Sequence, residues 1–219
     1  MTYLQLVNKV LVKLRESQSV TLAESTYISL IADFVNEAKT DVENAWDWTM
    51  LRTALTINCV PGTSTYSMTN ARTSWRFLKK GNYGYNTTVK SPLTMITHDY
   101  YDSLTKLITP PSAAPSYFRI NGVDSSGDSK IDVYPTPDAT DALAFTLVVP
   151  QAELSGVTDV IKVPWLPVVL GAYALAIEER GEDGGTVSNK QDIKYRLALD
   201  DAISQDAARV AEETTWESV

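Results

Sequence analysis

Two residues that carry much enzyme chemistry are almost absent from this sequence of 219 residues, which has one histidine, His98, and one cysteine, Cys59. A single cysteine excludes a disulfide framework within the chain. One histidine and one cysteine also cannot supply the four ligands of a zinc site, so we expect no metal site. His98 precedes Asp99, as in a base and its orienting group, but no nucleophile motif surrounds Cys59. We therefore interpret His98 as a surface residue at a helix start and Cys59 as a small apolar residue.

Phosphate-binding loops are missing as well. Residues 79–86, KKGNYGYN, contain two glycines but lack the lysine–serine ending of a nucleotide-binding loop. Residues 181–185, GEDGG, follow a predicted helix, where the helix dipole and the acidic side chains repel phosphate. We expect no cofactor and no catalytic residue. An enzyme or ligand-binding domain with an unrecognised site stays open as an alternative of another class.

Positive charge is in deficit, because 19 lysines and arginines face 27 aspartates and glutamates, for a net charge of −8. This balance argues against a protein that grips nucleic acid by neutralising phosphates, but not against a wall past which nucleic acid slides. Long apolar runs are also absent: residues 165–177 are too few to span a bilayer and include Pro167 and Gly171. The first residues do not have the pattern of a signal peptide.

Apolar residues at helical spacing are present near both ends of the chain. They recur every three or four positions from Leu4 to Leu14 and from Tyr27 to Ala45, which predicts two helices. Thr21 and Glu24 have the spacing of a capping box and predict the start of the second helix. A proline-led segment from Val163 is apolar on every side for three turns and ends at glycines 181, 184 and 185. A helix of this kind must be enclosed by other protein.

A long β-rich region lies between the second predicted helix and the helix that begins near Val163. Short strand patterns occupy residues 50–60, 64–68, 73–80, 88–96, 116–120, 130–135 and 143–149, and a helix is predicted over 97–108. The turn at Pro61–Gly62 predicts a hairpin of the first two strands, and GNYGYN, residues 81–86, a loop. The sequence thus predicts an α+β fold, in which an antiparallel, sandwich-like or barrel-like β module is inserted into a helical bundle. The predicted helical domain comprises residues 1–48 and 161–213, the β domain residues 49–160, and the extended tail residues 214–219.

Aromatic side chains in the β module suggest partner contacts, because tyrosine and tryptophan are enriched at protein interfaces. Tyr83 and Tyr85 lie in the glycine-flanked loop and are the best candidates, although most tyrosines of the module are expected in its core. Asp124 and Asp128 fall in DSSGD, which lacks the length of a calcium loop and is typical of a plain turn, with a weak cation contact as the alternative. In the tail, Trp216 is flanked by acidic groups and is poorly suited to packing on its own subunit.

The order of motifs in the second half of the chain resembles that of the bacteriophage head-to-tail adaptor proteins, the family that includes tail tubular protein A of podoviruses. The residues that carry this resemblance are AAPSYFRI at 113–120, KIDVYPTPDATDALAFTLVV at 130–149, and the segment from Pro150 to Gly185. The helical pair that leads into AWDWTMLRT, residues 45–53, is similar to the start of that family.

The resemblance implies a structural virion protein that forms a ring, expected to be a dodecamer, in the neck between capsid and tail. Such a ring docks on the portal protein, extends the channel through which double-stranded DNA passes without specific binding, and offers a platform to tail or nozzle proteins. It implies synthesis in the host bacterial cytoplasm and no membrane partner. The expected portal-side residues are Arg209, Val210, Trp216, Glu217 and Val219; the expected tail-side residues are Tyr83, Tyr85, Asp124 and Asp128. Another neck or tail completion protein is the nearest alternative.

Overall fold

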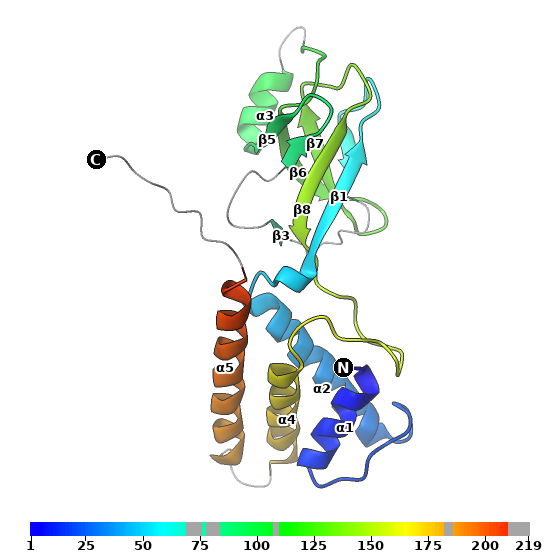
Figure 1. Cartoon of the computed structure of the whole chain (residues 1–219). Coiled ribbons are helices and arrows are strands. Elements are labelled where there is room, and N and C mark those ends of the chain that lie inside the picture. The colour runs from blue at the N-terminus through cyan, green and yellow to red at the C-terminus, as the bar shows by residue number, and fades with distance from the viewer. Residues whose placement is uncertain (69–75, 78–83, 107–109, 182–185, 210–219) are drawn as a thin grey trace, which may run out of the picture. The chain divides into compact units, whose positions relative to one another are not determined.

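The computed structural model describes residues 1–68, 76–77, 84–106, 110–181 and 186–209 (Figure 1). The chain divides into a helical unit, Met1–Leu51 with Pro150–Val219, and a β unit, Arg52–Val149. Residues 150–160, which the sequence placed in the β domain, group with the helices. The chain leaves the helical unit once, builds a sheet and returns, and this arrangement confirms the predicted α+β fold.

A central helix organises the helical unit. The helices of this unit are α1 (Tyr3–Lys13), α2 (Thr26–Ala45), α4 (Trp165–Arg180) and α5 (Thr186–Ala207), with a short 3-10 helix, η1 (Thr49–Leu51), before the sheet. Helix α4 contacts α1, α2 and α5, and Figure 1 shows it between α5 and α1. Its apolar residues on most sides are buried by these three neighbours, as the sequence predicts for a helix without a polar face. The left-handed residue Gly181, with φ of 61°, ends α4 as expected.

The start of α2 differs from the sequence prediction. Ser25 caps the helix by accepting a hydrogen bond from the Ile28 N–H at 3.2 Å, so α2 begins later than the predicted capping box at Thr21 and Glu24. The Glu24 carboxylate instead accepts hydrogen bonds from the Ser19 hydroxyl and the Val20 N–H. The Glu24 carboxylate therefore stabilises the loop before α2 instead of capping the helix.

Buried polar groups fix the returning segment on α2. The Asn36 side chain donates to the Leu154 carbonyl and accepts from the Leu154 N–H, both at 3.0 Å. The Lys39 ammonium donates to the Gln151 carbonyl at 2.9 Å and forms an ion pair with Glu43 at 3.2 Å. Both charged side chains are 1% exposed. These contacts explain why residues after Val149 belong with the helices.

One mixed sheet forms the β unit. Its strands are β1 (Arg52–Asn58), β2 (Thr65–Ser67), β3 (Arg76–Phe77), β4 (Gly84–Asn86), β5 (Ser91–Met95), β6 (Tyr117–Val123), β7 (Ser129–Tyr134) and β8 (Ala142–Val148). They are ordered β1-β8-β4-β5-β6-β7-β2, with β3 also paired to β8, in a nearly closed, barrel-like arrangement. Helix α3 (His98–Thr105) connects β5 to β6.

Three sequence predictions about this sheet are wrong in detail. Strands β1 and β2 do not form the expected hairpin: β1 pairs with β8 and β2 with β7. Residues 84–86 of the expected GNYGYN loop form strand β4 between β8 and β5. The sheet is also not purely antiparallel, because β5 and β6 are parallel. A parallel pair requires a crossover connection, and α3 lies within it.

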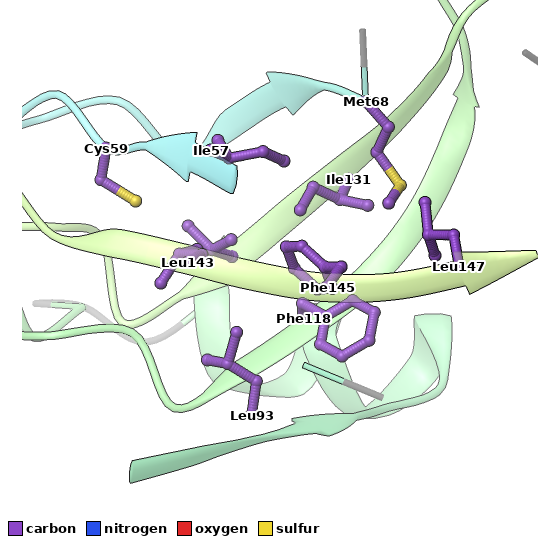
Figure 2. Close-up of a cluster of buried hydrophobic side chains, with 10 residues drawn as sticks. Ile57, Cys59, Met68, Leu93, Phe118, Ile131, Leu143, Phe145 and Leu147 are labelled. Carbon is purple, nitrogen blue, oxygen red and sulfur yellow. The ribbon is translucent and has the colours of Figure 1, made fainter. Parts of the chain in front are cut away.

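The β unit has its own apolar core (Figure 2). The core contains side chains from strands across the whole sheet, among them Ile57 of β1, Leu93 of β5 and Ile131 of β7. The rings of Phe118 and Phe145 pack edge to face, with centroids 5.3 Å apart and planes at 73°. Such a pair is worth roughly 0.5–1.5 kcal/mol beyond its buried area. This core fixes the positions of the strands that carry Tyr85, Tyr117 and the turn at Asp124.

Candidate partner-binding surfaces

The helical unit has a groove between the N-terminal half of α4 and the part of α5 from Lys194 onward. Its volume is about 540 Å³. Trp165, Leu166 and Leu170 of α4 line one wall, and Lys194 and Leu197 of α5 lie on the other. The remaining lining residues are Met50, Pro164, Pro167, Ala198, Asp201, Ala202, Gln205, Asp206 and Arg209. Most of this lining is apolar.

Several large apolar side chains around this groove remain exposed to solvent. Trp165 is 39% exposed, Leu166 43% and Leu197 60%, and Met50 is exposed as well. Scattered exposed apolar residues are normal, but a contiguous apolar groove marks a site of interaction. The sequence predicts that other parts of the protein bury α4 on every side. In the structure, Trp165 and Leu166 at the start of α4 remain exposed.

Asp206 forms the polar floor at one end of the groove. This α5 residue is 1% exposed, and its carboxylate accepts hydrogen bonds from the Thr49 N–H at 2.9 Å, the Thr49 hydroxyl at 2.5 Å and the Trp46 indole N–H at 3.2 Å. The contacts tie α5 to the junction between α2 and η1. Sequence reasoning missed Asp206, although its position four residues after Ala202, on the core-facing side of α5, is a signal for a paired buried acid.

Of the expected portal-side residues, Arg209 is described. It is exposed directly after α5, lines the groove and lies 3.8 Å from the Asp206 carboxylate. The other expected portal-side residues, Val210, Trp216, Glu217 and Val219, lie outside the described residues. The last turn of α5 and Arg209 after it therefore form part of the groove wall.

The expected tail-side residues have different settings. Tyr83 lies outside the described residues, whereas Tyr85 lies on strand β4 and is 40% exposed. The Asp124 carboxylate accepts hydrogen bonds from the N–H groups of Ser126 and Asp128 at 2.8 and 3.0 Å, which closes the turn between β6 and β7. A hydrogen bond with Ser67, and to a lesser extent these backbone hydrogen bonds, lowers the pKa of Asp124. The DSSGD segment is thus a turn stabilised by its own aspartate.

The tyrosines of the β unit divide between core and surface. Tyr101 and Tyr134 are buried and pack edge to face, with ring centroids 6.4 Å apart. Burial raises the pKa of Tyr101. Tyr100 is 48% exposed on α3 and packs against the ring of Tyr117 on β6. Tyr85 and Tyr100 are therefore the exposed tyrosines in the described part of the β unit.

An ionic network that the sequence did not reveal holds α3 against the sheet. The Arg119 guanidinium donates to Asp132 at 3.0 Å and to Asp102 of α3 at 2.9 Å, and it stacks 4.0 Å over the Tyr101 ring. Hydrogen bonds from Lys106 and then Arg119 lower the pKa of Asp102. Because the buried Asp132 also accepts from Asn121 and Thr65, the group is satisfied internally, as expected of a structural network.

Cys59 and His98 have different settings in the structure. Cys59 is 2% exposed, and burial raises the pKa of its thiol. A protonated, buried thiol is a poor nucleophile. His98 is exposed at the first position of α3, as predicted. Among the described residues, no cluster of three or more potential metal ligands occurs and no helix is suited to cross a membrane.

Comparison with known proteins gives a match over nearly the entire chain. A family model with the description SU10 adaptor protein matches residues 1–217, which include both units and the α4–α5 groove. A search of curated proteins finds no match. The resemblance to phage head-to-tail adaptors, stated above from the sequence, is confirmed at the level of the family. The chain therefore belongs to the SU10 adaptor protein family and is a structural adaptor protein of a bacteriophage.

Proposed function

We propose that this adaptor forms a dodecameric ring in the virion neck, similar in its task to tail tubular protein A. The ring docks on the portal, extends the DNA channel and gives tail or nozzle proteins their attachment platform. The observation that carries the proposal is the family match over residues 1–217, which spans both units. Two separate units suit an adaptor, since one can serve the capsid side and the other the tail side.

The exposed groove of the helical unit supports self-assembly. A ring of identical subunits needs two different faces on each copy that meet in a contact which closes on itself. Exposure of the apolar surface around Trp165, Leu166 and Leu197 to water is unfavourable in free energy. Burial of this surface in an assembly removes that cost.

The net charge of −8 supports passage of DNA rather than its capture. When acidic subunits surround a channel, their summed potential repels phosphates. Double-stranded DNA then moves through the ring without adhering to the wall. Specific DNA binding is no part of this function.

The C-terminal end of α5 and the residues after it form the portal side of the proposed adaptor. They include Arg209, Val210, Trp216, Glu217 and Val219. Deletion of residues 214–219 should leave the fold intact and weaken attachment to the portal, because a terminal segment with one large apolar side chain is suited to order on a partner. Variant particles that keep both genome and tail at normal levels would show that this assignment is wrong.

The tail side of the proposed adaptor lies in the β unit and includes Tyr83, Tyr85, Asp124 and Asp128. Replacement of Tyr83 and Tyr85 by serine should reduce the joining of tails more than the yield of folded protein. Tyr100→Ser, at another exposed tyrosine of the same unit, is the matched control. Equal loss of tails in the control variant contradicts the assignment.

Electron cryomicroscopy of the virion neck tests the function as a whole. A ring of this chain between portal and tail, with the helical unit at the portal, is the expected result. Finding the chain at another place in the particle refutes the proposed adaptor ring and favours a different neck or tail completion protein.

A further inference from the structure

Two surfaces of the helical unit, one on α2 and one between α4 and α5, differ in charge. On α2, exposed acidic residues recur at every fourth position, namely Asp33, Glu37 and Asp41. This spacing places them along one side of the helix. The buried residues of α2, among them Ile31, Val35, Ala38 and Val42, follow other sides. None of the three acidic residues forms an ion pair with another described residue. We name this surface the acidic α2 face.

Two half-buried apolar residues accompany these carboxylates. Leu30 and Phe34 flank the stripe toward the start of α2, and Phe34 lies three residues before Glu37. The acidic α2 face therefore offers apolar area toward one end and negative charge along its length. Such a combination fits a surface that is apolar at its centre and basic at its rim.

The α4–α5 groove has these properties. Its centre is formed by Trp165, Leu166 and Leu197. Lys194 lies on the α5 wall, and the Lys9 ammonium of α1 lies 4.8 Å from the centroid of the Trp165 ring. The lining also includes Arg209 and two aspartates, Asp201 and the buried Asp206. The exposed charges around the groove are therefore three positive ones, Lys9, Lys194 and Arg209, and one negative one, Asp201.

The groove and the acidic α2 face lie on different sides of one copy. Leu166 and Leu170 of α4 line the groove and share a stripe. Gly171 lies on another side of α4, where an added Cβ would be 3.1 Å from Ala38 of α2. On α2, Glu37 lies roughly 100° around the helix from Ala38. Asp41, at the other end of the stripe, lies closer to α5, where burial and then the Asp41 charge raise the pKa of Tyr195. One copy cannot bring the two surfaces together, whereas two copies in succession can.

We propose that the α4–α5 groove of one copy binds the acidic α2 face of the next copy, and that this contact, repeated, closes the ring. The inference rests on the proposed function, because it names the surfaces that build its ring. The contact is heterologous, as ring closure requires. A groove-to-groove contact is disfavoured, since it places Lys9 and Lys194 opposite lysines of the second copy.

Cross-linking in assembled particles tests the contact. A chain with Leu197→Cys and Glu37→Cys is incorporated into virions and treated with a short bifunctional maleimide. The native Cys59 is buried and does not interfere. The expected result is a ladder of multiples of the subunit. The control pair is Leu197→Cys with Val20→Cys, where Val20 is 79% exposed in the loop between α1 and α2, and it should give no ladder.

The outcomes separate this inference from the proposed function. Virions that contain the chain at the portal but give no ladder overturn the inference alone. Dimers from Leu197→Cys by itself also overturn it, because they show a groove-to-groove contact. Particles that join their tails without this chain overturn the proposed function and the inference together.

Charge exchange provides a second measurement that does not depend on cysteines. Lys9→Glu with Lys194→Glu, or Glu37→Lys with Asp41→Lys, should lower incorporation into particles by roughly tenfold, because like charges then meet across the contact. A chain with all four substitutions should recover most of the loss. Circular dichroism confirms that each variant is folded. Recovery no better than with either pair alone overturns the proposed contact.

Discussion

Asp206→Ala should destabilise the helical unit strongly, although the residue lies on a helix with three other aspartates. Its carboxylate accepts three hydrogen bonds, from the N–H and hydroxyl of Thr49 and from the indole of Trp46. Each donor that is left without a partner in a buried setting costs roughly 1–3 kcal/mol. Part of this cost is recovered where water enters, since Thr49 and Trp46 are half-buried. We expect a loss of about 3 kcal/mol in the free energy of unfolding.

Urea unfolding followed by far-UV circular dichroism measures this loss, because the helices dominate that signal. For a chain of this size, the expected loss lowers the melting temperature by about 6–12 °C. Asp201→Ala is the matched control: this exposed aspartate on the same helix should change the stability by less than about 0.5 kcal/mol. A loss below about 1 kcal/mol for Asp206→Ala, or equal losses in both variants, would refute the reasoning that Asp206 anchors the junction.

Three further predictions concern stability. Lys39→Ala should cost about 3–5 kcal/mol in urea unfolding, because it removes the ion-pair partner of the buried Glu43, and Lys39→Met with Glu43→Leu should cost less; equal costs contradict this reasoning. Gly84→Ala should lower the melting temperature of the β unit, since its Cβ would lie 2.6 Å from the Phe145 ring. The substitution should cost less in a Phe145→Leu background, and additive effects would contradict the contact. Burial raises the pKa of Tyr3 to about 12, so its contribution to stability should be complete below about pH 10 and disappear as the pH rises to about 12. Tyr3→Phe should flatten the dependence of the urea midpoint on pH in that range, and an unchanged slope contradicts the assignment.

The helices were predictable because their signals are local. The apolar stripes of α1 and α2, the unbroken apolar character of α4 and the glycine after Arg180 each follow from residues within a few turns. The start of α2 was missed because Glu24 has two competing uses, as a capping acceptor or as a loop acceptor. A spacing rule does not distinguish between them.

Strand pairing was less predictable, because it depends on residues far apart in the chain. The turn at Pro61–Gly62 exists, with φ of 80° at Gly62, but the strands beside it pair elsewhere. Strand β4 looked like a loop because it is short and contains Gly84. That glycine is needed in the sheet, since the Phe145 ring of the neighbouring strand occupies the space of a side chain.

The candidate surfaces also depend on residues that are far apart in the chain. This dependence explains which part of the function the sequence could reveal. The acidic stripe on α2 is visible in the sequence as a solvated helix face, which is how charged stripes are usually interpreted. Its counterpart is assembled from α1, α4 and α5, and Lys9 and Lys194 are 185 residues apart. Only the folded helical unit brings them to the two flanks of one apolar groove. A surface built in this way cannot be recognised from spacing, so motif order identifies the family while the assembly contact has to be inferred from packing.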